Sequence, residues 1–168
     1  MRNEPFAPTL ARAPRMLSQT AEHALRAVLY LGHHAEDGLI SAGRLAEALG
    51  TPPNYTSKIL RRLAHRGILR SARGPRGGFG LRVRPAAVSL ARLVDAIDEA
   101  RDAPSICLIG DRPCDPAAPC PAHRAWTDVQ ARMNALMEET TLDQLLEGGT
   151  APSTPWRTRH TLQSWSIR

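Results

Sequence analysis

The sequence predicts a mainly α-helical fold that contains one short β-hairpin and a long helix near the C-terminus. Apolar residues recur at helical spacing in successive segments of the chain. A glycine-rich stretch between two short strand-like segments predicts the hairpin, and an apolar stripe over residues 121–139 predicts the long helix. With 168 residues, the chain is long enough for one domain with a real core.

Two helices are predicted ahead of the most basic part of the chain. The first covers residues 18–34, where Ser18 or Thr20 can cap its start. The second covers residues 41–49 and stops at Gly50. Residues 1–15 contain three prolines and little apolar content, so we expect them to form a disordered leader.

A third helix is expected to begin at Thr51-Pro52-Pro53, which supplies a cap residue and a proline suited to a first turn. It runs to His65, and Ile59, Leu60 and Leu63 form its apolar stripe. The opposite face carries polar and cationic side chains and no acidic one. A helix of this kind buries one side and leaves a basic side for a partner.

Residues 68–71 and 79–83 read as short strands on either side of the segment Arg73-Gly74-Pro75-Arg76-Gly77-Gly78. This pattern is typical of a β-hairpin with a glycine-rich, basic tip. Two short helices, a polar third helix and a basic hairpin in succession describe a winged helix-turn-helix, which we expect over residues 16–100. In that fold the polar helix enters the major groove of DNA.

The distribution of charge supports a nucleic-acid partner. The chain carries a net charge of +6, with 22 Lys and Arg residues and 16 acidic ones. Ten of the cations lie between residues 51 and 94, and none of the acidic residues does. A surface of this kind binds a polyanion through counterion release, whereas a solvated face without a partner normally has acidic residues interspersed.

The C-terminal part is expected to hold a sensor loop and a dimerisation helix. A helix over residues 89–100 leads into a cysteine-containing loop at residues 101–121. Residues 122–148 are expected to form the dimerisation helix and a short capping helix, which opens with a Thr141-x-x-Gln144 capping box. The stripe of the long helix consists of Trp126, Val129, Met133, Leu136 and Met137. A helix of a second subunit is its simplest partner, and residues 149–168 are expected to form a flexible tail.

Three cysteines lie in the loop with the spacing Cys107-x6-Cys114-x5-Cys120, and His123 follows. An odd number in a chain without a signal-peptide core argues against a disulfide framework and favours metal binding or thiol chemistry. Three thiolates and one further ligand can hold an iron–sulfur cluster. Structural zinc is an alternative, although zinc sites usually space cysteines about two to four residues apart. A cluster-free thiol switch is another alternative.

Three segments, residues 55–63, 67–71 and 73–81, together resemble the Rrf2 family of bacterial transcription regulators. Its members include IscR-like and NsrR-like iron–sulfur repressors, and the resemblance extends over residues 16–148. It implies a homodimer that binds double-stranded operator DNA through a winged helix-turn-helix. In many members it also implies an iron–sulfur cluster, of the 2Fe-2S or 4Fe-4S type, that tunes this binding.

For the cysteine loop, the resemblance implies that Cys107, Cys114 and Cys120 are cluster ligands. His123 stands where IscR-like 2Fe-2S members have their fourth ligand, and Glu22 stands where some other members place an acidic ligand from the opposite subunit. The first gap, six residues, is one longer than is usual in the family. The expected function is a repressor, not an enzyme, whose cluster senses nitric oxide, redox state or iron–sulfur status. A thiol-switch regulator of the same fold is the alternative.

We expect the third helix to read operator bases and the wing to hold phosphate or minor-groove positions. The residues expected to do so are Asn54, Tyr55, Thr56, Ser57, Lys58, Arg61, Arg73, Arg76 and Gly77. No apolar run approaches the ~18 residues that a membrane span needs. We therefore expect a cytoplasmic protein with no membrane partner.

Overall fold

The computed structural model describes residues 17–98, 107–109, 115 and 117–148. The elements, in chain order, are α1 (Gln19–His33), the 3-10 helix η1 (Ala35–Asp37), α2 (Ala42–Leu49), α3 (Pro53–His65), β1 (Leu69–Ala72), β2 (Gly78–Leu81), the 3-10 helix η2 (Pro85–Ala87), α4 (Leu90–Ile97), α5 (His123–Glu139) and α6 (Leu142–Gly148). The predicted leader at 1–15 and the predicted tail at 149–168 lie outside the described residues, as do Cys114 and most of the predicted loop at 101–121.

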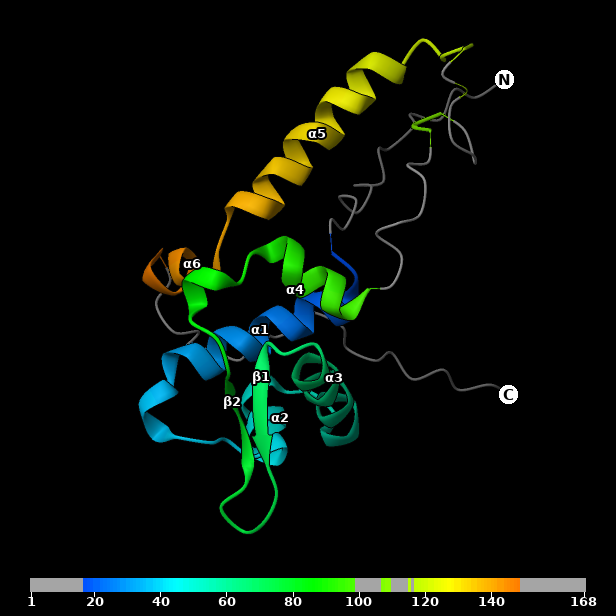
Figure 1. Ribbon diagram of the computed structural model, residues 1–168. Helices are drawn as coiled ribbons and strands as arrows, with labels where there is room; N and C mark the ends of the chain where they lie inside the picture. Colours follow the sequence, from blue (N-terminus) through cyan, green and yellow to red (C-terminus); the bar gives the residue numbers. More distant parts are fainter. Residues whose placement is uncertain (1–16, 99–106, 110–114, 116, 149–168) are drawn as a thin grey trace, which may run out of the picture.

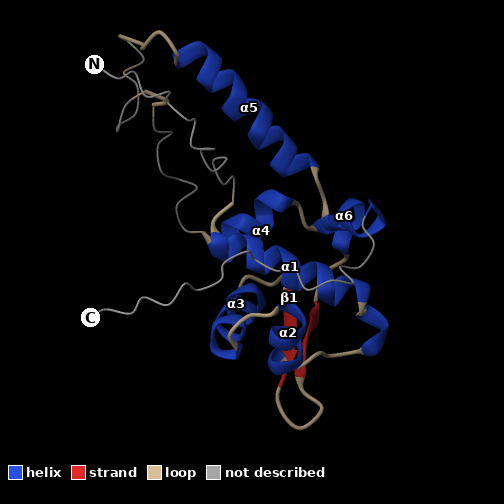
Figure 2. Cartoon of the chain, turned by 180° about the vertical axis from the view of Figure 1, so that it is seen from behind, coloured by secondary structure: helices blue, strands red, loops and turns tan. Residues whose placement is uncertain are grey.

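Helix α1 lies at the centre of the fold, and α2, α3, α4 and α6 pack around it (Figure 1). The hairpin β1–β2 lies at one end together with α2 and α3, and α5 extends away at the opposite end. Figure 2 shows the same arrangement from behind. The predicted class, mainly helical with one two-stranded antiparallel sheet, is confirmed.

Serine side chains begin three of the helices. The hydroxyl of Ser18 accepts a hydrogen bond of 3.0 Å from the N–H of Ala21, so its predicted role as the cap of α1 is confirmed. Ser41 and Ser89 cap α2 and α4 in the same way. Each cap satisfies a backbone donor that the first turn of a helix leaves without an internal partner.

The start of α3 differs from the prediction. Pro52, not Thr51, is the N-cap residue, and Pro53 occupies the first helical position, where its fixed backbone angle suits a helix. The Thr51 hydroxyl lies 2.7 Å from the hydroxyl of Thr56, one turn into the helix. Two consecutive prolines therefore set the start of this helix, and Thr51 acts on a side chain rather than on the backbone.

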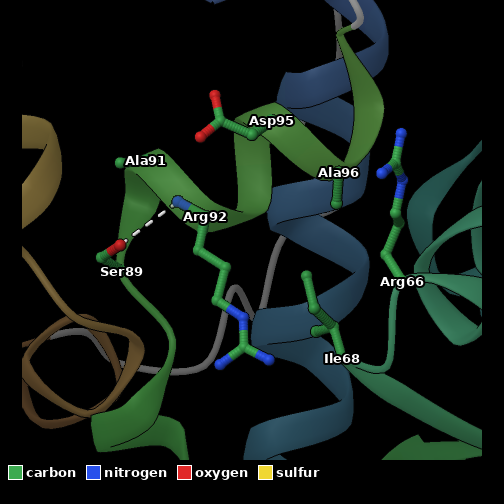
Figure 3. Close-up of a pocket in the computed structure, with 7 residues that line it drawn as sticks. All are labelled: Arg66, Ile68, Ser89, Ala91, Arg92, Asp95 and Ala96. Carbon is green, nitrogen blue, oxygen red and sulfur yellow. Dashed lines mark hydrogen bonds between the residues drawn. The ribbon is translucent and has the colours of Figure 1, made fainter.

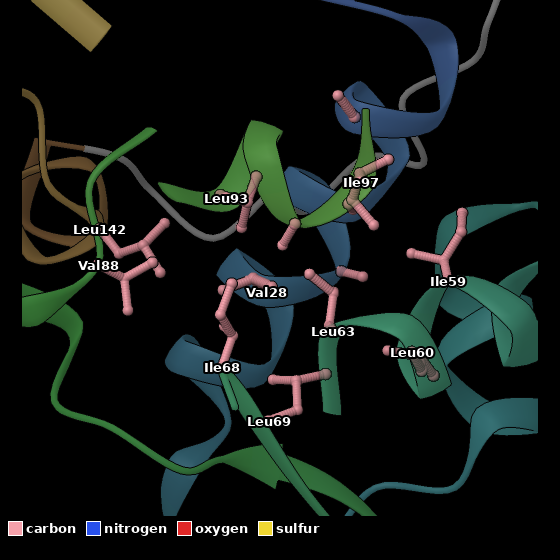
Figure 4. Packing of buried hydrophobic residues seen from close by; sticks show 14 of the residues in the cluster. Val28, Ile59, Leu60, Leu63, Ile68, Leu69, Val88, Leu93, Ile97 and Leu142 are labelled. Atoms are coloured by element: carbon pink, nitrogen blue, oxygen red, sulfur yellow. The ribbon is translucent and has the colours of Figure 1, made fainter. Parts of the chain in front are cut away.

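The hydrophobic core forms where the apolar faces of α1, α3 and α4 meet (Figure 4). The predicted stripe of α3 is confirmed: Ile59, Leu60 and Leu63 are buried, the last two completely. Other elements contribute the fully buried side chains of Leu31, Leu45, Ile68, Leu69, Val88, Leu93 and Leu142. Burying one such side chain stabilises the fold by about 1.5–3 kcal/mol. This packing fixes which face of α3 points outward.

The hairpin is bound to the body of the protein through its second strand. Leu69 pairs with Leu81 and Ala72 with Gly78, in antiparallel register. Beyond this pair, the backbone of Ile40 exchanges hydrogen bonds of 3.0 and 2.8 Å with Phe79. A Cβ atom at Gly78 would lie 2.5 Å from the Ile40 carbonyl oxygen, so this close approach requires glycine.

Helices α5 and α6 follow the cysteine-containing loop expected at residues 101–121, which we call the cysteine segment. The predicted capping box is present, since the Gln144 side-chain oxygen accepts a hydrogen bond of 3.0 Å from the N–H of Thr141. Of the α5 stripe, Met137 is buried, but Val129 and Leu136 are each 50% exposed. Among the described residues of a single chain, therefore, part of the apolar face of α5 stays exposed.

The packing of α3 predicts the effect of a cavity there. We expect Leu63→Ala to lower the free energy of unfolding by about 2–5 kcal/mol, because the surrounding side chains can only partly fill the space. Denaturant titration at fixed protein concentration measures this loss. Lys58→Ala, on the exposed face of the same helix, should change stability by less than about 0.5 kcal/mol. Equal losses for the two variants would contradict the assigned orientation of α3.

Candidate nucleic-acid interface and cysteine pair

The outward face of α3 presents three predicted contact residues to solvent. Asn54, Lys58 and Arg61 are exposed, and Ser57 is half-buried beside them. The helix contains no acidic residue. Amide and cationic side chains at this spacing can donate hydrogen bonds to base edges and to phosphates.

Thr56 and Tyr55, two further predicted contact residues, are less exposed than Asn54 and Arg61. Thr56 is buried, and its hydroxyl donates to the Pro52 carbonyl oxygen at 3.2 Å. Tyr55 is half-buried, and its hydroxyl donates to the Thr20 hydroxyl at 3.2 Å, which ties α3 to α1. Both side chains help to hold α3 in place, and their expected contacts with bases stay predictions.

The wing tip presents two more cations at the end of the molecule that lies opposite α5 (Figure 1). Arg73 and Arg76 are exposed on either side of Gly74 and Pro75. Gly74 has a φ of +106°, a backbone conformation that favours glycine. The turn therefore separates the two guanidinium groups at the tip of the hairpin without burying either.

Gly77 has a structural place in the wing. Its N–H donates a hydrogen bond of 2.9 Å to the Gly74 carbonyl oxygen, which closes the turn. A Cβ atom there would lie 2.4 Å from the Ala72 carbonyl oxygen. Because its donor is used and its side is crowded, Gly77 shapes the wing that carries the arginines.

Arg62 is a residue whose position the sequence did not reveal. It follows the exposed Arg61, but it is half-buried, and its Nε donates a hydrogen bond of 3.1 Å to the carbonyl oxygen of Ala96 in α4. The helical stripe of Ile59 and Leu63 places position 62 at the edge of the buried face, and this spacing was the available signal. Which helix it meets depends on the tertiary fold.

Residues 51–94 contain no acidic residue of their own. Ion pairs occur between Arg26 and Glu22 and between Arg44 and Asp37, outside residues 51–94. Exposed cations that are not neutralised locally maintain a positive potential, which attracts a polyanion and concentrates it at the surface.

Two of the predicted cysteine ligands lie together. The sulfur atoms of Cys107 and Cys120 are 3.4 Å apart, although 13 positions separate the residues in the chain. The N–H of His123 donates a hydrogen bond of 2.9 Å to the Cys120 carbonyl oxygen at the start of α5. Cys114 lies outside the described residues, and among those that are described, no three His, Cys, Asp or Glu side chains gather as a metal site.

The alternative ligand Glu22 lies on α1 rather than in the cysteine segment. It forms an ion pair with Arg26 one turn further along the helix. Within one chain, the structure therefore brings Cys107 and Cys120 together and does not bring Glu22 to them. A role for Glu22 would need the opposite subunit.

The side chain of His23, a residue of α1, contacts Tyr55 of α3. Its ring meets the Tyr55 ring edge-on, with centroids 5.5 Å apart. In the part of the chain that the structure describes, its buried Nδ1 atom has no hydrogen-bond partner. Burial and, next, the Arg26 guanidinium lower the pKa of His23, while the Glu22 carboxylate raises it in part. The neutral imidazole is therefore the form that fits this contact.

The fold, with a basic recognition helix and a basic wing, defines a winged-helix DNA-binding protein. The family model Rrf2, described as an iron-dependent transcriptional regulator, matches residues 17–148. The chain therefore belongs to the Rrf2 family of transcriptional regulators, as its wing and recognition-helix segments suggested.

Similar proteins include the transcriptional regulators named IscR from two bacteria. The chain is 26% identical to the one from Photobacterium profundum over 152 residues, which are 90% of this chain and 87% of the relative. It is 28% identical to the one from Yersinia enterocolitica over 130 residues, 77% of this chain and 78% of the relative. These relatives regulate transcription, which is a non-enzymatic function, in agreement with the prediction.

Solved structures share the fold. CymR of B. subtilis, named the global cysteine regulator, matches with a TM-score of 0.67 and 20% identity over 80% of this chain and 98% of that one. IscR of T. potens matches with a TM-score of 0.62 and 20% identity over 82% and 90%. Among the described residues, no helix is both long and apolar enough to span a bilayer.

The environment of His23 predicts a pH dependence of stability. Because the pKa of His23 is lowered from 6.5 in the folded protein, the unfolded chain binds its proton first as the pH falls. The stability that the neutral form contributes is complete above pH 6.5 and is lost as the pH falls toward the folded pKa. The difference in unfolding free energy between wild type and His23→Gln should therefore shrink from pH 7.5 to about pH 5.5.

Thermal or denaturant unfolding at several pH values measures this difference. The matched control is His65→Gln on the exposed face of α3. A difference between wild type and His23→Gln that stays constant over the whole range would contradict the assigned environment of His23.

Proposed function

We propose that the protein is a cytoplasmic, homodimeric repressor that binds operator DNA through α3 and the wing, and that its cysteine segment sets the operator affinity. One observation supports this proposal most strongly. The basic block at residues 51–94, which contains no acidic residue, includes the exposed face of α3 and the tip of the wing. Counterion release from such a surface supplies binding energy for any duplex. Side chains in the major groove then supply the sequence preference.

The roles divide between the two elements. Asn54, Lys58 and Arg61, with Ser57 beside them, are the candidates for base contacts, because they are the predicted residues on the outward face of α3. Arg73 and Arg76 hold phosphate or minor-groove positions. Tyr55, Thr56 and Gly77 act on DNA indirectly, by fixing the helix and the turn that carry these groups.

The dimer forms through α5. Val129 and Leu136, both half exposed in the single chain, lie on one helix together with Trp126 and Met133. Apolar side chains at three- and four-residue steps pack favourably against a second helix with the same pattern. A second copy of α5 supplies that pattern and gives a DNA-binding protein two recognition helices for two half-sites.

The cysteine segment suits an iron–sulfur cluster in its donor chemistry. The sulfur atoms of Cys107 and Cys120, 3.4 Å apart, would supply two thiolate ligands to such a cluster. Cys114 would be the third thiolate ligand and His123 the fourth ligand, with Glu22 of the opposite subunit as the alternative. When bound, the cluster supplies a group that nitric oxide, oxidants or iron shortage can alter. The iron-dependent description of the family supports this reading.

A thiol switch of the same fold is the second candidate, and the same sulfur distance favours it. Two thiols 3.4 Å apart need only a small movement to reach the disulfide length of about 2.05 Å. The reaction would release two protons and pass two electrons to an oxidant such as a peroxide. The cluster and the disulfide use the same sulfur atoms, so they exclude each other.

The division of roles predicts the effect of removing the wing charges. Arg73→Ala combined with Arg76→Ala should weaken binding to all duplexes, because these side chains contact the backbone. If both contact phosphates, the slope of log K against log salt should fall in magnitude by about 1.8. Fluorescence anisotropy with an operator fragment and an unrelated fragment, at several salt concentrations, measures both effects.

The control is the double variant Arg124→Ala with Arg132→Ala, which removes two exposed cations from α5 at the other end of the molecule. It has the same net charge as the wing variant and should leave the salt slope unchanged. Equal slopes for the two double variants would remove the wing from the interface.

The cluster proposal predicts iron and acid-labile sulfide in protein purified without oxygen, together with charge-transfer absorption in the visible range. Cys107→Ser and Cys120→Ser should each lose the iron and the colour, since each removes a thiolate ligand. Ala118→Ser, an exposed position in the same segment, is the control and should keep both. Zinc in place of iron would instead indicate a structural site.

A colourless, iron-free protein that loses operator affinity on mild oxidation would favour the thiol switch. Mass spectrometry of the oxidised protein should then find a disulfide between Cys107 and Cys120. If affinity changes with neither iron nor oxidation, the cysteine segment is not a sensor of either kind.

A further inference from the structure

Helix α4 connects the cysteine segment to the recognition helix from both of its ends. Its N-terminal end is bound to the end of α5, because the Leu90 N–H donates to the Thr140 carbonyl oxygen at 2.9 Å. Next to this bond, the Leu142 N–H donates to the Val88 carbonyl oxygen at 2.9 Å. The cysteine segment begins a few positions after the C-terminal end of α4 and ends where α5 begins. Along the chain, the cysteines thus lie between the C-terminal end of α4 and helix α5, whose own end is bonded to the start of α4.

The C-terminal turn of α4 is in turn held by the two helices of the DNA-binding domain that lie beneath it. The last carbonyl groups of a helix have no partner within the helix. Arg62 of α3 supplies one by donating from Nε to Ala96 at 3.1 Å. Ser18 of α1 donates to the carboxylate of Asp98 at 2.8 Å. The cationic donor also lies at the negative end of the helix dipole, where it is favoured.

Beside this contact, the surface is hollowed between α4 and the end of α3. The hollow has a volume of about 380 Å³, and Figure 3 shows the residues that line it. It is lined by Arg66 and Ile68 on one side and by Ser89, Ala91, Arg92, Asp95 and Ala96 on the other. The carbonyl group that Arg62 holds thus belongs to a residue at the edge of this hollow, Ala96.

We propose that Arg62 is a positioning residue, which transmits the state of the cysteine segment from α4 to the recognition helix. The inference rests on the proposed function, and it separates Arg62 from its neighbour Arg61. Arg61 is exposed and is a proposed DNA contact, whereas Arg62 donates to a carbonyl oxygen of α4. A shift of the α4 end thus moves α3 without any change in the groups that meet DNA.

The test compares operator affinity in two states of the cysteine segment. Full-length protein is prepared with its thiols reduced and, separately, oxidised with diamide; cluster-loaded protein is added where iron is retained. Anisotropy titration with a duplex from the protein's own promoter gives a ratio of affinities between states for wild type, Arg62→Met and Arg61→Met. Both variants lose one charge from adjacent positions of α3.

In Arg62→Met the ratio should fall toward one by about twofold to thirtyfold, the range by which residues along a coupling network alter allosteric coupling. In Arg61→Met both affinities should fall by the same factor and the ratio should stay that of wild type. Arg62→Lys keeps the charge, but its ammonium group reaches less far than a guanidinium group. This variant should therefore restore only part of the ratio. If wild type and Arg62→Met have the same ratio, and this ratio differs from one, the inference is overturned while the sensor proposal stands.

Two other outcomes also decide between the proposals. A wild-type ratio of one overturns both the sensor proposal and this inference. If Arg62→Met does not fold, or if no duplex is bound, amide hydrogen exchange of wild type in the two states decides. Exchange should change in the last turn of α4 and in α3 together, and a change confined to α5 overturns the inference.

Discussion

The structure depends on the amphipathic packing of α3. Leu60 and Leu63 are completely buried against α1 and α4, and no rotation of the helix could expose them without losing several kcal/mol of apolar burial. This constraint fixes the opposite face toward solvent, where the cations lie. The proposed interface with DNA is therefore not a separate feature added to the fold, since it is the outer side of the helix whose inner side forms the core.

The sequence predicted the fold well because most of its signals are local. Apolar periodicity places the helices, serines begin three of them, and the glycine-rich segment between two strands forms the wing. The deviations come from details that compete locally. Thr51 has the right chemistry for a cap, but Pro52 and Pro53 determine where the helix begins, so its hydroxyl bonds to Thr56 instead.

The site was predicted less completely, for reasons that individual residues make clear. Thr56 lies three and four positions before Ile59 and Leu60, so its burial follows from the same periodicity that found the stripe. Arg62 could not be assigned in that way, because its partner Ala96 lies 34 positions away on a helix whose placement is tertiary. The same holds for Cys107 and Cys120, whose sulfur atoms meet only when the chain between them folds back.

The electrostatic attraction of DNA and the proposed control of operator affinity depend on different parts of this protein. By the proposed function the basic block attracts any duplex, and the three cysteines lie outside this block in the sequence. A change at the cysteines leaves the cations themselves in place, so it cannot regulate binding by removing the electrostatic attraction. In the proposed dimer such a change would instead alter where the recognition helices lie, and binding is sensitive to this because both helices must match half-sites at a fixed spacing. A small shift of α4 against α3 would then act on both half-sites at once.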